Sequence, residues 1–168
     1  MNATTRRSLQ IQEGRTSYEA AYLAGYADGE GCFCVTFNRS SRHRFGWEIR
    51  PSFSVSQNAD RAEVLDMFQQ TFGEGTIRPD RSDRTLKYET RSVPVLATKV
   101  VPFFRQHQLL SSKKDEFERF AAIVLSMHAG EHLTEDGFAK IVELARELNA
   151  SGAKRYGRSG IVPLQMNA

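Results

Sequence analysis

Two carboxylates stand between glycines in residues 28–31, Asp-Gly-Glu-Gly, at the end of a stretch of small and apolar residues that is typical of a helix. The strand-like segment CFCVTFN follows at once. The helix macrodipole places about half a negative charge at the C-terminal end, so Asp28 and Glu30 are disfavoured there unless a cation joins them. A divalent metal is the simplest such cation, because hard oxygen ligands suit Mg²⁺ or Ca²⁺. These residues therefore predict a metal site at the helix end.

Residues 23–31, LAGYADGEG, resemble the nine-residue signature of the LAGLIDADG homing endonucleases. Glu30 stands where the signature has its final aspartate, so a carboxylate is kept at that position. The residues alone leave a plainer alternative open, which is an Ala/Gly-rich packing helix that ends in a glycine cap.

The resemblance implies a reaction centre at this helix end. In the family, each motif helix brings its last acidic residue to the centre of a dimer, where the scissile phosphates lie. By position that residue is Glu30, with the Gly29 carbonyl as a further metal ligand and Mg²⁺ as the metal, for which Mn²⁺ or Ca²⁺ can substitute in binding. The metal would polarise the phosphate, lower the pKa of an attacking water and neutralise the leaving oxygen. Asp28 is assigned mainly to structure, with a direct catalytic role as the alternative.

Other positions also match the family's catalytic machinery. Gln57 holds the position of the polar residue that typically orients the catalytic water, and Arg61 resembles a member of the basic pocket around that water. Lys113 and Lys114 lie in the kind of segment that carries the family's active-site lysine, and the resemblance does not choose between them. The plainer alternatives are a strand-end glutamine, an exposed arginine and two solvated lysines. Two lysines at the positive end of a helix oppose its dipole, so we expect an anionic partner.

The composition agrees with a nucleic-acid-binding protein without requiring one. The 168 residues suit one domain with a real core, and 23 Lys and Arg against 20 Asp and Glu give a mildly basic chain. Cys32 and Cys34 lack partners for a zinc site and are too close for an easy disulfide, so we expect reduced thiols. No apolar run reaches the length of a membrane span. We expect no membrane contact and a cytoplasmic protein, or an organellar one if an organelle encodes it.

Capping and alternation signals predict the elements that position these residues. Thr16 and Glu19 match a capping box, which predicts a helix over 17–27. Alternating apolar and polar residues predict four strands, over 32–38, 47–56, 76–78 and 85–89. Apolar periodicity predicts further helices over 60–72, 93–106, 113–127 and 134–148. Within 93–106, Pro102 must kink or restart the helix.

This order predicts an α+β fold of the α-β-β-α-β-β-α type, which is also the family's pattern. Alternation alone implies a four-stranded antiparallel sheet with helices on one face, and the resemblance implies a saddle-like DNA-binding sheet on the other. We divide the chain into a flexible N-terminal arm (1–15), a single endonuclease domain (16–150) and a basic C-terminal tail (151–168).

The small residues of the first helix predict an assembly. Ala20, Ala21, Ala24 and Gly25 recur at three- and four-residue spacings, so another helix can approach this face closely. A second copy of the same helix is the natural partner, because the chain holds only one motif. A homodimer would read a long, roughly palindromic site of about two helical turns.

We expect double-stranded DNA to contact the polar strand face and the basic segments. The predicted base-reading residues are Thr36, Asn38, Arg42, Arg44, Glu48, Arg50, Ser54, Arg78 and Lys87. Lys154, Arg155 and Arg158 are predicted to touch phosphates.

The sequence thus predicts a homodimeric, Mg²⁺-dependent, site-specific double-strand DNA endonuclease. The alternative is a non-catalytic nucleic-acid-binding protein of the same fold, either a splicing cofactor that binds its host intron RNA or a transcription regulator. A purely structural dimerisation protein would leave the basic loop and the polar strand faces unexplained.

Overall fold

The computed structural model describes the backbone of residues 3–80 and 84–156, and the side chains of residues 16–80 and 84–148. Its elements follow the predicted order and confirm the α+β class. They are α1 (Ala3–Glu30), β1 (Gly31–Arg39), β2 (Trp47–Asn58), η1 (Ala59–Arg61), α2 (Glu63–Phe72), β3 (Thr76–Pro79), β4 (Thr85–Thr90), α3 (Val93–Val95), η2 (Leu96–Val100), α4 (Val101–Gln106), α5 (Lys113–His128), η3 (Glu131–Leu133) and α6 (Glu135–Tyr156).

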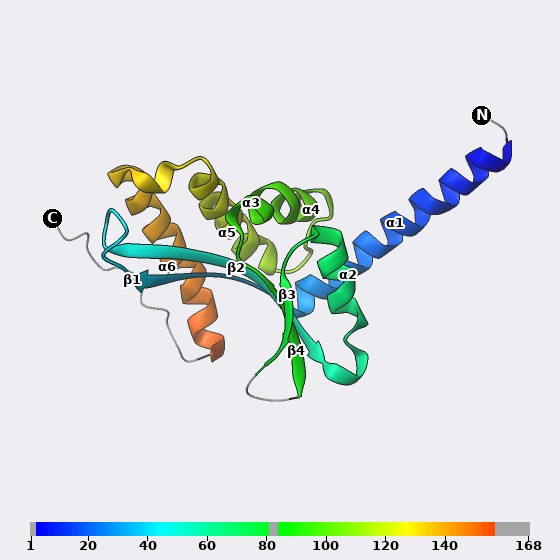
Figure 1. Cartoon of the computed structure of the whole chain (residues 1–168), viewed down its shortest axis with the longest axis horizontal. Coiled ribbons are helices and arrows are strands. Elements are labelled where there is room, and N and C mark those ends of the chain that lie inside the picture. The colour runs from blue at the N-terminus through cyan, green and yellow to red at the C-terminus, as the bar shows by residue number, and fades with distance from the viewer. Residues whose placement is uncertain (1–2, 81–83, 157–168) are drawn as a thin grey trace.

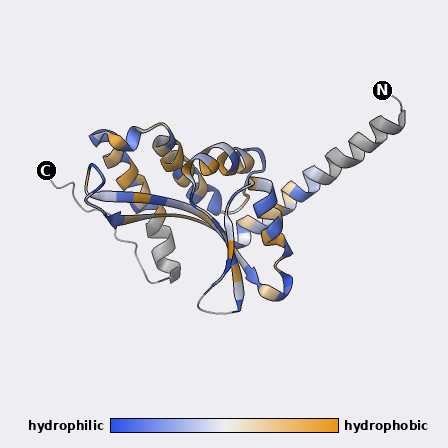
Figure 2. Ribbon diagram, viewed as in Figure 1, coloured by the Kyte–Doolittle hydropathy of each residue, from blue (hydrophilic) through white to orange (hydrophobic). Residues whose placement is uncertain are grey.

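The strands form one antiparallel sheet in the order β1-β2-β4-β3. The longest pairing joins β1 to β2, from Gly31 opposite Val55 to Arg39 opposite Trp47. The helices α3 to α5 cover one face of the sheet (Figure 1). Hydrophilic and hydrophobic residues alternate along the strands (Figure 2), as expected for a sheet with one packed and one open face.

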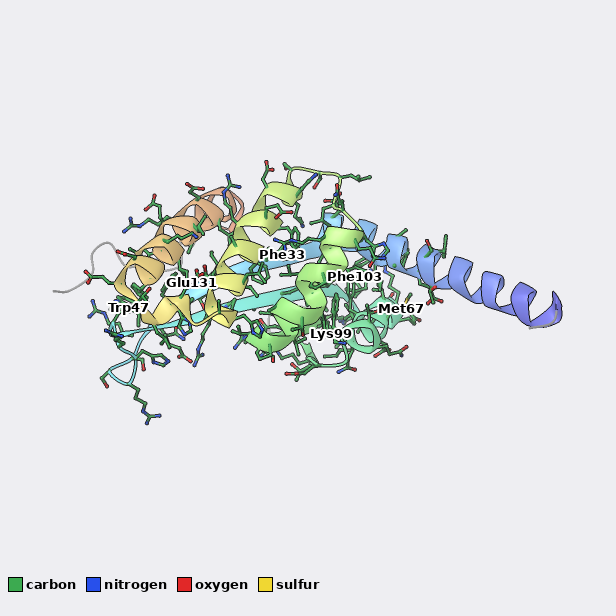
Figure 3. The ribbon with its side chains drawn as sticks, turned by 90° about the horizontal axis from the view of Figure 1, so that it is seen from above. Phe33, Trp47, Met67, Lys99, Phe103 and Glu131 are labelled. Carbon is green, nitrogen blue, oxygen red and sulfur yellow. The ribbon has the colours of Figure 1, made fainter. Side chains whose placement is uncertain are left out.

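The core lies between this sheet and the helices, and aromatic rings fill its centre. The Phe33 ring lies 5.2 Å from that of Phe53 in β2, and 5.3 to 5.4 Å from those of Phe104, Phe117 and Phe120 in the helices. Such aromatic pairs add about 0.5–1.5 kcal/mol each beyond their buried area. Figure 3 shows Phe33 near the middle of the sheet and Trp47 at the end remote from α1. The core therefore fixes the end of α1 relative to α4 and α5.

The first helix begins well before the predicted position. α1 starts at Ala3, so the predicted capping residues Thr16 and Glu19 lie inside the helix. Nucleating a helix is costly while extending one is not, so a helix anchored by its packed C-terminal half continues through residues of adequate propensity. α6 likewise runs to Tyr156, beyond the predicted end at 148. The division into arm, domain and tail stays a prediction, although a helix crosses each of its boundaries.

Pro102 restarts its helix, as predicted. α3 is followed by five π-helical residues, Leu96–Val100, before α4 resumes at Val101 with a proline in its first turn. Proline has no N–H to donate and its ring clashes with the carbonyl four residues earlier, which is that of Thr98. The wider π-helical turn accommodates this break without ending the segment.

Candidate active site and nucleic-acid interface

The inner side of the α1 end is held by the loop before α5. The Asp28 carboxylate accepts hydrogen bonds from the backbone N–H groups of Leu110 (3.1 Å) and Ser111 (2.9 Å), and from the Ser111 hydroxyl (2.5 Å). Burial alone would raise the pKa of Asp28, but these hydrogen bonds and the charge of Lys113 outweigh it and lower the pKa. Asp28 therefore anchors the helix end, which is the structural role that the sequence favours.

Lys113 and Lys114 differ sharply in their surroundings. Lys113 is only 6% exposed, and its Nζ donates to the carbonyls of Gly31 (2.5 Å) and, more weakly, Gly29 (3.4 Å). The Lys114 Nζ instead lies 3.3 Å from the Gln108 side chain, at the exposed start of α5. The expected anionic partner of Lys113 is thus the negative end of α1.

The outer side of the same helix end carries the two predicted metal ligands. Gly29 and Glu30 are both exposed. Gly31, in contrast, is enclosed, because a Cβ there would lie 2.5 Å from the Ala27 carbonyl oxygen. In the described part of the chain, no three His, Cys, Asp or Glu residues gather closely enough to hold a metal within one protomer. One protomer thus presents a single exposed carboxylate and a neighbouring exposed backbone segment.

Gln57 and Arg61 meet the motif through Tyr26, a residue that the sequence did not single out. The Gln57 amide donates to the Tyr26 hydroxyl (2.5 Å), and its oxygen accepts from the Asn58 N–H (2.7 Å). Burial raises the pKa of the Tyr26 phenol, the negative charge of Glu30 raises it further, and the positive charge of Arg61 opposes this. Gln57, Glu30 and Arg61 therefore lie around one neutral tyrosine. In the sequence, the aromatic residue at the fourth position of the motif was the signal that could have indicated this role of Tyr26.

The predicted small-residue face is divided between the inside and the outside of the protomer, and its role in a dimer stays a prediction. Ala24 is 5% exposed and packs inside the protomer, and Ala20 lines a hollow against Met67 and Phe103. The helical period explains this, because Ala20, Ala24 and Ala27 share the face of Leu23, which is 2% exposed. The exposed face instead carries Tyr18, Ala21, Tyr22, Gly25 and Gly29.

The polar face of the long β1–β2 hairpin carries connected side chains. Glu48 and Arg50 form an ion pair (2.9 Å), and the Asn38 amide lies 3.2 Å from the same guanidinium when its oxygen faces Arg50. Thr36 is exposed on β1, opposite Arg50 in the register. These four predicted base-reading residues therefore form one polar group on the open face.

Two of the predicted base-reading residues, Ser54 and Arg44, have other contacts in this protomer, and their role in DNA binding stays a prediction. Ser54 is 3% exposed, in the central row of the sheet between Cys32 of β1 and Glu89 of β4. Arg44 turns towards the helices, where it donates to the Leu133 carbonyl (3.0 Å). Alternation predicts which face a strand residue takes, but not how deeply its neighbours cover it or where a loop side chain folds.

The remaining basic residues divide by position. Arg42 is exposed in the hairpin loop, whereas Arg78 and Lys87 are paired across β3 and β4. Lys154 and Arg155 belong to α6, of which only the backbone is described at these positions. Arg158 lies outside the described residues. Their contact with phosphates stays a prediction.

The two cysteines are free thiols, as expected. Partial burial raises the pKa of Cys34 to about 11, so this thiol stays protonated.

No helix among the described residues is long and apolar enough to cross a membrane.

Comparison with known proteins places this α+β chain in a family. The family model described as LAGLIDADG endonuclease matches residues 23–124, from the motif to the middle of α5. The chain belongs to this family.

Curated relatives are longer than this chain. It is 26% identical over 148 residues to the probable intron-encoded endonuclease 2 of Neurospora crassa. This alignment covers 86% of this chain and 33% of that protein. It is 30% identical over 118 residues to the DNA endonuclease I-CeuI of Chlamydomonas moewusii, covering 69% of this chain and 54% of that one. The chain thus spans about a third to a half of these relatives.

Solved structures agree with the fold. The homing endonuclease I-TnaI superposes with a TM-score of 0.73 at 34% identity, over 83% of this chain and 94% of that chain. I-SmaMI, bound to its uncleaved DNA target in the presence of calcium ions, gives 0.73 at 26% identity, over 89% of this chain and 52% of that one.

Proposed function

We propose that this chain is a homing endonuclease that cuts both strands of a specific DNA site as a homodimer, using Mg²⁺ held at Glu30. One observation carries the proposal. Glu30 is exposed at the end of a helix whose inner side is held by the contacts of Asp28 and Gly31. A carboxylate in that position opposes the helix dipole and has no structural task in the protomer.

A second copy of α1 is the partner that suits the exposed helix face. Tyr18 and Tyr22 lie on this face and are 75% and 45% exposed, and neighbouring exposed apolar residues mark interaction surfaces. A Cβ at Gly25 or Gly29 would meet nothing within 4 Å in the protomer. The absence of side chains there is explained by close helix–helix approach in a dimer.

Divalent metal binding agrees with the donor set at this end. Glu30 and the Gly29 carbonyl are hard oxygen ligands, and two copies together would supply two carboxylates. The calcium ions in the I-SmaMI complex support a divalent ion for this chain, with Mg²⁺ as the proposed cofactor and Mn²⁺ or Ca²⁺ able to substitute in binding. When bound, the ion supplies Lewis-acid chemistry at the scissile phosphate.

The surrounding residues have distinct proposed roles. Gln57, held by Tyr26, positions water beside the phosphate, and Arg61 adds positive charge next to it. Lys113, rather than Lys114, is the active-site lysine, because its ammonium group lies at the carbonyls of the motif. A buried cation there stabilises negative charge that develops on the phosphate.

The open sheet face is the proposed DNA surface. The twelve residues of β2 extend about 40 Å at about 3.3 Å per residue, enough to follow about ten base pairs in the major groove. Two copies related by a two-fold axis would read a pseudo-palindromic site.

The alternative is a non-catalytic nucleic-acid-binding protein of the same fold, such as an intron RNA maturase or a transcription regulator. Glu30, Gln57 and Lys113 favour the nuclease, because a binding module has no need of this constellation. Several relatives are named for introns, so the compartment of this chain would follow the genome that carries its gene, cytoplasmic or organellar.

One experiment tests the proposal and the alternative together. The protein is incubated with a randomised duplex library in Mg²⁺, in Ca²⁺ and in EDTA, and both the bound and the cut molecules are sequenced. We expect one long, roughly palindromic site, bound in Ca²⁺ and cut only in Mg²⁺. A site that is bound but never cut would establish the non-catalytic alternative.

A further inference from the structure

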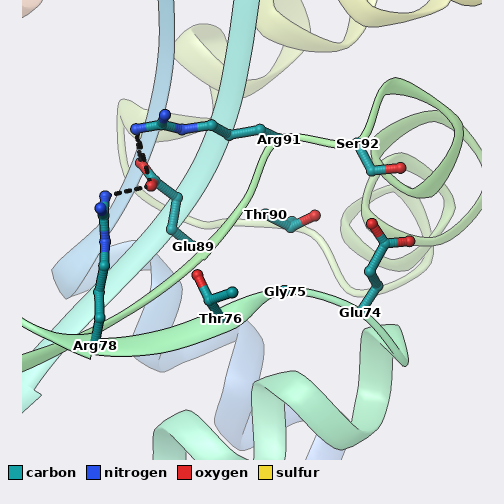
Figure 4. Close-up of a pocket in the computed structure, with 8 residues that line it drawn as sticks. All are labelled: Glu74, Gly75, Thr76, Arg78, Glu89, Thr90, Arg91 and Ser92. Carbon is teal, nitrogen blue, oxygen red and sulfur yellow. Dashed lines mark hydrogen bonds and ion pairs between the residues drawn. The ribbon is translucent and has the colours of Figure 1, made fainter.

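Arg78, Glu89 and Arg91 form a connected ion cluster on the polar side of β3 and β4, here named the arginine clamp (Figure 4). Glu89 Oε2 lies 2.7 Å from Nη2 of Arg78 and 3.0 Å from Nη2 of Arg91, which also donates to Oε1 at 3.2 Å. Glu89 is 8% exposed, whereas both arginine side chains are 54% exposed. One buried carboxylate thus holds two exposed guanidinium groups.

The clamp leaves most arginine donors free. A guanidinium has five N–H donors, and in the described part of the chain each of these two uses only its Nη2 group. The buried carboxylate offsets one of the two positive charges and fixes both planes, so the cluster carries a net charge of about one. A simple phosphate contact gains nothing from such a neighbour, because the carboxylate repels the phosphate. A fixed fork with free donors matches the O6 and N7 edge of guanine.

We propose that Arg91, together with Arg78, reads guanine edges in the inner part of each DNA half-site, and that Glu89 positions both guanidinium groups. This inference rests on the proposed function and adds two residues, Glu89 and Arg91, that the sequence did not indicate. Arg91 lies beyond the end of β4, where strand alternation no longer predicts a face.

The register of the sheet places the clamp near the cut. Glu89 is opposite Ser54, which is opposite Cys32, the second residue after Glu30. The polar group on the hairpin lies further along the same strands, with Thr36 and Arg50 four residues away and Asn38 and Glu48 six residues away. At about 3.3 Å per residue these separations are about 13 and 20 Å, or about four and six base pairs. The clamp therefore reads inner positions, and the hairpin group reads outer ones.

The sheet surface beside the clamp has room for a base edge. A hollow of about 500 Å³ is bounded by the clamp on one side and by Glu74 and Ser92 on the other. Thr90, which is 2% exposed, is one of the residues around this hollow, and its own hydroxyl is buried.

The test compares base preferences of the purified full-length chain and its variants on the randomised duplex library. Arg91→Ala and Arg91→Lys are each expected to reduce the preference for guanine at one or two inner positions by about tenfold or more, with outer positions unchanged. Lys keeps the charge but loses the fork, so it should retain affinity and still lose discrimination. Glu89→Gln keeps the side-chain shape and should relax the positions that Arg91→Ala and Arg78→Ala affect. Arg119→Ala, which removes an ion pair with Glu147 on the helices, is the matched control and should leave every position unchanged.

Three results would overturn the inference. The first is an unchanged base-preference profile in Arg91→Ala, and the second is an equal loss of affinity of that variant for all sequences, as the loss of a phosphate contact gives. The third is a Glu89→Gln variant with normal stability and the wild-type base-preference profile. Each requires that the wild-type chain prefers a defined site. If the wild type itself selects no site, the proposed function fails instead.

Discussion

The two sides of the C-terminal turn of α1 have opposite surroundings although they are made by neighbouring residues. The inner side packs Asp28 against Ser111 and the carbonyl of Gly31 against Lys113. The outer side leaves Gly25, Gly29 and Glu30 exposed. One turn of helix thus both anchors the fold and presents the proposed reaction centre. Substitutions of the two carboxylates, Asp28 and Glu30, should therefore separate stability from activity.

The largest effect is expected at the outer carboxylate. Glu30→Gln removes a charged metal ligand, and several kcal/mol of lost transition-state stabilisation corresponds to about 10³-fold slower cleavage. Site-specific binding in Ca²⁺ and the free energy of unfolding should change little, because Glu30 is exposed. Cleavage is followed on a defined site, and retention of the wild-type rate in Mg²⁺ would remove Glu30 from the proposed centre.

Gly25→Leu should break the outer side by a different route. The added side chain is expected to clash with the partner helix and weaken dimerisation by about 100-fold or more, as for overpacked interfaces. The protomer itself should gain about 0.5–1 kcal/mol, since leucine favours a helix over glycine and meets no neighbour there. Sedimentation measures the assembly, with Gly25→Ala as a graded control. An unchanged dimer would remove this face from the interface.

The two lysines sharpen the comparison. Lys113→Met removes the cation beside Gly29 and Gly31, and we expect cleavage to fall by about 10²-fold. Lys114→Met, the matched control, removes only a contact with Gln108 and should change cleavage by less than about twofold. Single-turnover cleavage at saturating protein separates this loss from weaker binding. Equal effects of the two variants would contradict the assignment.

The smallest effect is expected at the inner carboxylate and concerns stability. Asp28→Asn loses charge-assisted hydrogen bonds to the segment before α5, at a cost of about 1–2 kcal/mol in the free energy of unfolding. The pKa of Asp28 is lowered on folding, so its contribution is present above the unfolded pKa of about 4 and is lost as the pH falls through the folded value. Urea unfolding at pH 7 and at pH 3 should show a smaller difference for the variant than for the wild type.

Much of the fold could be predicted because periodic signals report on local structure. Alternation predicted the strands, and the missing N–H of Pro102 predicted the restart of its helix. The start of α1 could not be predicted, since a capping box inside a longer helix looks the same in sequence as one at its end. The motif also predicted that Glu30 lies at the end of the first helix, because this position depends only on spacing along the chain.

The rest of the site depends on contacts between distant segments. Lys113 and Lys114 are equivalent in sequence, and only the packing of α5 against α1 distinguishes them. Tyr26 meets Gln57 across 31 residues, and Glu89 gathers two arginines from both sides of its position. The burial of Ser54 likewise follows from neighbouring strands that alternation does not identify.

Localised oxidative cleavage by bound iron tests the central claim most directly. Fe²⁺ replaces Mg²⁺ in the complex with the target DNA, and ascorbate and peroxide then generate radicals that cut the polypeptide beside the metal. We expect cuts within residues 28–31, which mass spectrometry locates, and the loss of these cuts in Glu30→Gln. Cuts confined to another segment, or an unchanged pattern in the variant, would contradict a metal at the exposed end of α1.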